Sequence, residues 1–329
     1  MLNYIRTLWR PEAFHGTGKK TNYFEGWFFK AVNATTEKIL AFIPGIFLSK
    51  NSVDSHAFIQ ILEGGMHQSA YHRFPISDFF SSPKKLEIRI RDNIFESTGI
   101  KLNLQKEGHS ITGKLLFHDL KSWPVTLTSP GVMGWYAFVP FMECFHGVVS
   151  LDHRIEGSIS LDHHSINFDN GRGYIEKDWG TSFPRSYIWI QSNHFEKAGV
   201  SLMVSVARIP WLTGAFRGFI IGLLLDDNLL KFTTYTGARL NYLKITDTHV
   251  SLEVTDRHYK LKIQAVRSEG GLLHAPYERQ MLQRVSETLS SQVEVWLFQV
   301  ENGKENLIFS GKGTPAGLDV NGKLAEIVD

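Results

Sequence analysis

The sequence predicts an all-β fold of antiparallel sandwiches or barrels, arranged in two domains. Many short runs alternate apolar and polar residues, as half-buried antiparallel strands do, and few helical patterns interrupt them. The chain has 329 residues, more than one hydrophobic core usually holds. We therefore expect a first domain over residues 1–160 and a second over residues 161–329.

The first half of the chain has the pattern of a meander. Apolar or alternating runs predict strands over residues 23–30, 38–48, 55–62, 86–90, 100–104 and 110–117. Gly64-Gly65 closes the first group of strands, and a loop rich in serine and proline over residues 77–83 separates it from the rest.

The second half repeats this pattern and adds one helix. Strands are expected over residues 201–208, 218–225, 229–235, 249–255 and 259–266, with turns at Asp227-Asn228, Asn302-Gly303 and Asn321-Gly322. The helix is expected over residues 276–289. Pro276 suits its first turn, and Met281, Leu282, Val285 and Leu289 have helical spacing.

Composition excludes several classes of protein. The 35 basic and 33 acidic residues give a net charge of +2, which provides no field for binding nucleic acid. Cys144 is the one cysteine, so neither an internal disulfide nor a cysteine-only metal site can form. A single cysteine fits a reducing compartment.

Two segments bear on membranes. The amino terminus lacks the apolar core and cleavage site of a secretory signal. The most apolar window, residues 209–225, is broken by Pro210, Arg217 and glycines, so we interpret it as two strands with a turn at residues 214–218. The prediction is a soluble, cytoplasmic protein that contacts membranes, if at all, through such a loop, with its oligomeric state open.

Residues 171–195 concentrate chemically active side chains. Pro184 divides them into two strands, whose side chains alternate between faces. Tyr174, Glu176 and Asp178 share one face of the first strand, and Tyr187, Trp189, Gln191 and Asn193 share one face of the second. Aromatic rings mixed with hydrogen-bonding groups are typical of a pocket lining.

A weak repeat links this segment to the amino terminus. Tyr23, Glu25 and Trp27 follow an order similar to that of Tyr174, Glu176 and Trp179. Two short matches give slight support to a duplicated barrel. We expect Glu25, Trp27 and Phe29 to face the domain junction, so that both halves build one pocket with Glu176.

Four longer segments carry a resemblance to a known family. They are YFEGWFFK (23–30), GVMGWYAFVPFMECFHGVVSLDH (131–153), GYIEKDWGTSFPRSYIWIQSNHF (173–195) and FTTYTGARL (232–240). Together they resemble the tocopherol cyclase family, from about residue 20 to the carboxyl end. The resemblance implies two lipocalin-like antiparallel β-barrel domains and, as in the plant members, closure of the chromanol ring of a prenylated hydroquinone.

That reaction needs an acid, a dry aromatic wall for a cation and groups that orient the phenol. It needs no metal or other cofactor. Burial among rings favours a protonated carboxyl group, and two neighbouring carboxyl groups resist joint ionisation. Glu176 is our first choice for the acid and Asp178 the second. The carotenoid hydratases are distantly similar at this acid-x-x-Trp-Gly stretch, and the match places their acid on Glu176.

The expected catalytic residues are therefore Glu176, Asp178 and Tyr174. The expected substrate-binding residues are Glu25, Trp27, Trp135, Trp179, Tyr187, Trp189, Gln191 and Asn193. Plainer interpretations stay open. Glu176 could form a structural ion pair with Lys177 or Arg172, the rings could be core, and the amides could be outward strand positions.

Other candidate sites are weaker. Asp152-His153 and Asp162-His163-His164 have metal-ligand types, but they lie at expected turns, so we expect no metal. Cys144 and His146 lack a third orienting group, and Gly171-Arg172-Gly173 lacks the lysine of a phosphate loop. Two functions remain, an enzyme that cyclises or hydrates an isoprenoid chain and a non-catalytic carrier of such lipids.

Overall fold

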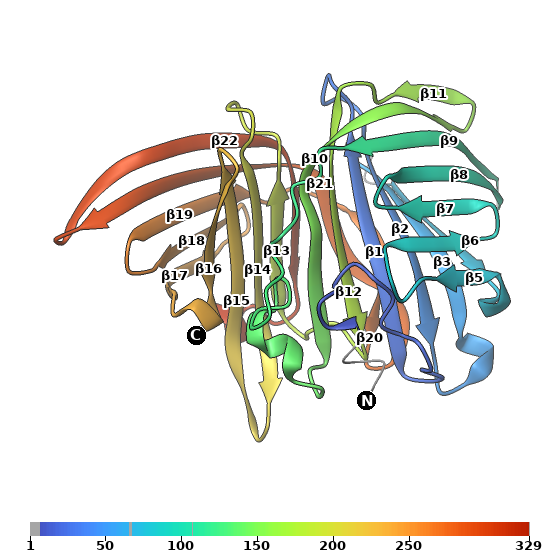
Figure 1. The fold of residues 1–329 in the computed structure, drawn as a ribbon, viewed down its shortest axis with the longest axis horizontal. Coiled ribbons are helices and arrows are strands. Elements are labelled where there is room, and N and C mark those ends of the chain that lie inside the picture. Colours follow the sequence, from blue (N-terminus) through green and yellow to red (C-terminus); the bar gives the residue numbers. More distant parts are fainter. Residues whose placement is uncertain (1–6, 66–67, 107, 329) are drawn as a thin grey trace. The chain divides into compact units, whose positions relative to one another are not determined.

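The computed structural model describes residues 7–65, 68–106 and 108–328 and contains two antiparallel sheets (Figure 1). The chain divides into two compact units. The first comprises Met1–Phe183 with Leu272–Arg284, and the second comprises Pro184–Gly271 with Val285–Asp329. The boundary expected near residue 160 is therefore misplaced. Strand β12 (Gly171–Gly180) lies beyond residue 160, yet it pairs in the middle of the first sheet.

The first sheet contains twelve strands in the order β4-β3-β2-β1-β12-β10-β9-β8-β7-β6-β5, with β11 paired to β10. Besides β12, they are β1 (Tyr23–Val32), β2 (Ile39–Leu48), β3 (His56–Glu63), β4 (Gln68–Phe74), β5 (Phe79–Ser81), β6 (Glu87–Ile90), β7 (Asn93–Glu96), β8 (Gly99–Lys106), β9 (His109–His118), β10 (Cys144–Leu161) and β11 (His164–Asn167).

This sheet curls around its own core. Strands β3 and β6 lie far apart in the strand order, yet they contact each other. Strand β8 alternates buried and exposed residues, whereas β1 is buried along nearly its whole length. A strand without alternation is covered on both faces. The core contains Trp27, Phe29, Phe42, Ile59, Phe95, Leu115 and Ile155, among others.

The second sheet has the order β16-β15-β14-β13-β22-β21-β19-β18-β17, with β20 paired to β21. Its strands are β13 (Tyr187–Ser192), β14 (Ser201–Trp211), β15 (Gly214–Leu225), β16 (Asn228–Thr233), β17 (Arg239–Ile245), β18 (His249–Thr255), β19 (Tyr259–Val266), β20 (Gly271–Tyr277), β21 (Gln280–Glu301) and β22 (Lys304–Asn321). Its core includes Ile188, Val204, Ile221, Phe232, Ile263, Val295 and Leu318.

The helix expected over residues 276–289 is wrong. These residues end β20, turn at Glu278 and Arg279 with φ of 46° and 67°, and begin β21. Met281, Val285 and Leu289 are spaced by four, and this spacing keeps residues on one side of a strand as well as of a helix. The apolar spacing alone therefore could not distinguish the two.

The helices of the described chain are short. They include the 3-10 turns η1 (Ser52–Asp54), η2 (Ile76–Asp78), η3 (Gly134–Phe138) and η4 (Thr234–Thr236), and the α-helix α2 (Ala325–Val328). Across residues 7–65, 68–106 and 108–328, no helix is long and apolar enough to cross a membrane. The apolar window 209–225 forms two strands as expected, with the turn at Leu212 and Thr213 instead of at residues 214–218.

Candidate active site

Strand β12 presents different side chains on its two faces, because successive strand residues point to opposite sides. Its register with β1 places Lys177 opposite Trp27, which belongs to the core of the first unit. Lys177 therefore lies on the inner face of the sheet, the one that faces this core. Tyr174, Glu176 and Asp178 lie on the outer face, as the alternation of the sequence predicts.

Polar side chains gather around Glu176 on the outer face, among them those of Tyr174, His146 and Asp178. The Tyr174 hydroxyl donates a hydrogen bond to Glu176 Oε2 at 2.5 Å. His146 of β10 lies with Nε2 3.6 Å from the same oxygen and with Nδ1 2.9 Å from Asp178 Oδ1. The side chain of Glu176 is 7% exposed and that of Asp178 is 27% exposed. We call Tyr174, Glu176, Asp178 and His146 the acid cluster.

The charge of the acid cluster depends on His146. Burial opposes the charged ring, but the carboxylates of Asp178 and Glu176 outweigh it and raise the pKa of His146 to about 9. Burial, reinforced by Glu176, raises the pKa of the Tyr174 phenol well above its usual value. At neutral pH the cluster therefore holds an imidazolium and a protonated phenol, both next to Glu176.

The cations expected beside Glu176 bind elsewhere. Lys177 lies on the inner face and donates to Glu25. Arg172 binds Asp152, with its Nε at 3.0 Å and one terminal nitrogen at 2.6 Å. The expectation of a structural ion pair between Glu176 and Lys177 or Arg172 is therefore wrong. The imidazolium of His146 lies beside Glu176.

Cys144 lies next to this cluster as a neutral thiol. Its Sγ is 3.9 Å from Asp178 Oδ1. Burial, together with the charge of Asp178, raises the pKa of the thiol well above its usual value. A thiol that stays protonated is a poor nucleophile, so His146 acts on the carboxyl groups and not as a base for Cys144.

Aromatic rings line the outer face beside the acid cluster. We call them the aromatic wall, and its members are Phe24, Phe47, Phe58 and Tyr71. The three phenylalanines are buried and pack as one group, and the ring of Tyr71 stacks on Phe58 with centroids 5.3 Å apart. Such rings stabilise a cation held over their faces.

Two glycines bring the aromatic wall close to the backbone near Asp178. Gly26 pairs with Asp178 on one side and with Gly45 on the other. The Phe58 ring covers Gly45, where a Cβ atom would come within 2.4 Å of the ring. Neighbouring strands lie about 4.8 Å apart, so Phe58 covers a position roughly 10 Å from the Asp178 backbone.

Segment 272–284 attaches to the far end of the aromatic wall. Gln60 accepts a hydrogen bond from the backbone N–H of His274 at 2.7 Å and donates one to its carbonyl at 3.2 Å. The His274 ring stacks on Tyr71 with centroids 4.1 Å apart, and the Tyr71 hydroxyl lies 2.6 Å from His56 Nε2. The sequence prediction missed these residues, because their strands carry no motif.

On the inner face, Glu25 and Lys177 form an ion pair whose side chains are both 0% exposed. Glu25 also accepts hydrogen bonds from the Tyr23 hydroxyl at 2.5 Å and from the backbone N–H groups of His15 and Gly16 at 3.0 and 3.1 Å. Every donor around this carboxylate favours its charged form. The pair joins the amino-terminal segment to the sheet.

Glu25 and Trp27 consequently do not share a pocket lining with Glu176. The register pairs Glu25 with Trp179 and Trp27 with Lys177, all on the inner face. Lys177 Nζ lies 4.6 Å from the ring centroids of both Trp27 and Trp179. The structure therefore corrects the prediction of one pocket. Trp27 and Phe29 belong to the core of the first unit, and Glu25 lies on the same face of β1 as they do.

The weak repeat has a structural meaning different from the one expected. Its two copies lie on β1 and β12, which pair with each other in one sheet and do not open two barrels. In each copy a tyrosine donates to the glutamate two residues later, at 2.5 Å. Tyr23 and Glu25 do so on the inner face, and Tyr174 and Glu176 on the outer face.

The second strand of the predicted site belongs to the second unit. Tyr187, Trp189 and Gln191 lie on the face of β13 opposite to Ile188 and Ile190, which are core residues. Like Asn193, they are buried. Their role in binding a substrate stays a prediction.

Trp135 lies in η3 and is 45% exposed, stacked on Tyr136 with centroids 4.0 Å apart. It is therefore not part of the buried aromatic wall.

Within the described residues, no group of three or more His, Cys, Asp or Glu side chains could hold a metal ion. Asp152 binds Arg172, and burial together with Arg172 lowers the pKa of His153 to about 3.

Sequence comparisons relate the chain to plant enzymes. It is 26% identical over 206 residues to "Probable tocopherol cyclase, chloroplastic" of Oryza sativa subsp. japonica and 26% identical over 203 residues to "Tocopherol cyclase, chloroplastic" of Zea mays. These regions cover 60% and 57% of this chain and 44% and 41% of those proteins. The chain thus spans less than half the length of the curated relatives it matches.

Structural comparison adds the fold. The crystal structure of CghA with Sch210972 matches with a TM-score of 0.56 at 10% identity, over 92% of this chain and 89% of that chain. At this identity the likeness shows a shared fold alone. The family model described as Tocopherol cyclase-like matches residues 95–322, more than half of the chain. The chain therefore belongs to the tocopherol cyclase-like family.

Proposed function

We propose that this protein is an enzyme that protonates a double bond of an isoprenoid lipid and closes a ring onto a phenol oxygen, with Glu176 as the acid. The observation that supports it most is a buried carboxyl group next to an imidazolium, on the same sheet face as the aromatic wall. The family match is consistent with this chemistry.

The proposed reaction is balanced without a co-reactant. The His146 imidazolium passes its proton to the Glu176 carboxylate, and the carboxyl group so formed transfers that proton to a trisubstituted alkene, which leaves a tertiary carbocation. The phenol oxygen attacks this carbon and forms the new carbon–oxygen bond. The phenolic proton then returns to the acid cluster, so that the product is an isomer of the substrate.

Each neighbour of Glu176 has a separate task in this proposal. His146 holds a proton 3.6 Å from Glu176 and supplies it to that carboxylate, which can then act as the acid. Asp178 bonds His146 and is partly exposed, so it connects the cluster to solvent. Tyr174 fixes the orientation of the carboxyl group. The aromatic wall would face the carbocation.

The raised pKa of His146 predicts a pH dependence. The cluster keeps its proton below about pH 9 and loses it as the pH rises through that value. We expect turnover to decline above about pH 9 in the wild type. His146→Gln should lower turnover and abolish this decline, whereas His109→Gln, at an exposed imidazole, should leave both unchanged. The measurement is a pH–rate profile of the three proteins. If turnover of His146→Gln declined above about pH 9 as that of the wild type does, this role for His146 would be excluded.

Incubation with a prenylated hydroquinone tests the function itself. Mass spectrometry of the extract should show a ring-closed product of unchanged mass. A product heavier by one water would identify a hydratase that uses the same acid. The second candidate function is a carrier, favoured by the buried rings of the aromatic wall, which would bind a prenyl chain with or without reaction. Tight binding with the substrate recovered unchanged would support the carrier and refute the enzyme.

A further inference from the structure

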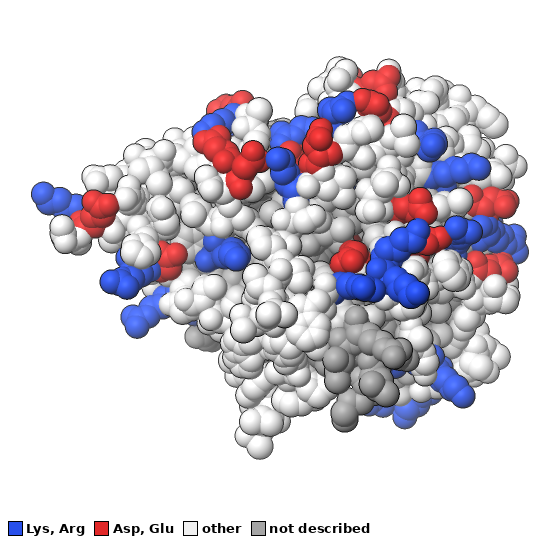
Figure 2. All heavy atoms as spheres, in the orientation of Figure 1, with Lys and Arg blue, Asp and Glu red and all other residues white. Residues whose placement is uncertain are grey.

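One loop of the first unit is apolar and uncharged over a long stretch. Residues 122–142 contain no Asp, Glu, Lys, Arg or His. Several large side chains of this loop are nevertheless exposed, Leu127 by 82% and Trp135 by 45%. Figure 2 shows no charged side chain over the part of the molecule where this loop, green in Figure 1, lies.

The amino-terminal segment adds to this surface. Trp9 is exposed by 37%, and its ring contacts Phe138 edge to face, with centroids 5.9 Å apart. Its indole N–H donates to the carbonyl of Leu127 at 3.2 Å. We call the exposed group the apolar loop surface, and it consists of Trp9, Val125, Leu127, Trp135 and Phe138.

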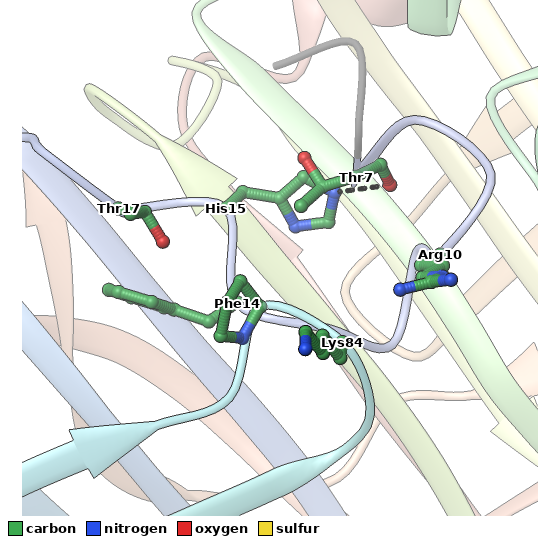
Figure 3. Close-up of a pocket in the computed structure, with 7 residues that line it drawn as sticks. Thr7, Arg10, Phe14, His15, Thr17 and Lys84 are labelled. Carbon is green, nitrogen blue, oxygen red and sulfur yellow. Dashed lines mark hydrogen bonds between the residues drawn. The ribbon is translucent and has the colours of Figure 1, made fainter. Parts of the chain in front are cut away.

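A cationic pocket begins at the residue that follows Trp9. Arg10 and Lys84 line a cavity of about 380 Å³ together with the hydroxyls of Thr7 and Thr17. Figure 3 shows Arg10 and Lys84 toward one end and Thr17 toward the other, with His15 hydrogen-bonded to Thr7. No carboxylate is among the described residues that line it, so the cavity suits an anion.

The two features together fit a lipid surface. Contiguous exposed apolar residues on a soluble domain mark an interaction site. Tryptophan is enriched where an apolar phase meets water, and an uncharged loop can enter that boundary without desolvating a charge. Cations at its edge attract anionic headgroups. An interface with a partner protein would instead have a polar rim around its apolar centre.

We propose that the apolar loop surface docks on a lipid bilayer and that Arg10 and Lys84 hold the phosphate of an anionic headgroup in the adjacent pocket. The docking concerns this surface, whatever reaction the acid cluster supports. It places the protein where an isoprenoid lipid would be dissolved. The membrane contact expected from the sequence through residues 209–225 involved a different loop, in the second unit.

Co-sedimentation with vesicles of phosphatidylcholine, with and without phosphatidic acid, tests the docking. We expect the wild type to bind vesicles, more strongly when phosphatidic acid is present. Leu127→Ser with Trp135→Ser should weaken binding to both kinds of vesicle by about tenfold or more, because two apolar side chains no longer enter the bilayer. Val53→Ser with Phe80→Ser removes two comparably exposed side chains elsewhere in the first unit and should bind like the wild type.

The pocket has its own test. Arg10→Ala with Lys84→Ala should remove the preference for phosphatidic acid and leave binding to phosphatidylcholine unchanged. Inorganic phosphate serves as the competing ligand. If it bound to the pocket and the preference for vesicles with phosphatidic acid stayed unchanged, the pocket would hold a soluble anion, and the headgroup assignment would be overturned. The docking would be overturned if the wild type failed to sediment with either kind of vesicle. It would also be overturned if sedimentation velocity showed a dimer that Leu127→Ser with Trp135→Ser dissociates, because the surface would then be a dimer interface.

Discussion

Glu176→Gln should lower turnover of a prenylated hydroquinone by about 100-fold or more and leave substrate affinity nearly unchanged. The amide keeps the size of the carboxyl group and can still accept the hydrogen bond of Tyr174, but it has no acidic proton to transfer. The two quantities are measured separately, turnover by chromatography of the product and affinity by quenching of tryptophan fluorescence. Asp178→Asn should have a milder effect, because Asp178 acts through His146.

A matched control separates this loss from a general effect of removing a carboxylate. Glu156 lies on β10, and its side chain is 42% exposed. Glu156→Gln should retain wild-type turnover. If Glu176→Gln cyclised or hydrated the substrate at the wild-type rate, Glu176 would not be the acid.

The second large effect concerns stability. Lys177→Met should destabilise the first unit by about 3–5 kcal/mol, because it leaves the fully buried carboxylate of Glu25 without its cation. The measurement is urea unfolding, followed by tryptophan fluorescence. Lys85→Met is the control, since Lys85 is 64% exposed in its ion pair with Glu87, and such pairs contribute at most about 1 kcal/mol.

The double variant tests whether the pair itself causes the effect. Glu25→Gln with Lys177→Met removes both charges and should cost less than the sum of the two single changes. Burial disfavours the Glu25 carboxylate, but Lys177 and His15 outweigh burial and hold its pKa below the usual value. The wild type should therefore lose stability as the pH falls through this lowered pKa, and the double variant should lose less. Strictly additive costs would contradict a coupled pair.

The strand pattern was predictable from local sequence, whereas the partners of each strand were not. Alternation placed Tyr174, Glu176 and Asp178 on one face, and the structure confirms that arrangement. Alternation cannot show which strand lies beside β12. His146 and Glu25 reach β12 through pairings with β10 and β1, so the imidazolium beside Glu176 and the true partner of Lys177 could not be predicted.

Other errors have similar causes. The sequence prediction placed Glu25 and Glu176 in one pocket because both follow a tyrosine by two residues. Residues paired across β1 and β12 share a face, and Glu25 pairs with Trp179, three residues from Glu176. The two glutamates therefore lie on opposite faces of the sheet. The aromatic wall depends on Phe58 covering Gly45, a contact across strands. The apolar loop surface was hidden, because exposure is a tertiary property that apolar composition does not reveal.

Turnover in D₂O tests the central claim most directly. The acid cluster exchanges its protons with solvent, so protonation of the alkene by Glu176 should place one deuterium on the carbon next to the new carbon–oxygen bond. We expect a wild-type product heavier by one mass unit and almost none of it from Glu176→Gln. Ring closure without deuterium, or equal deuteration by Glu176→Gln, would contradict protonation by Glu176.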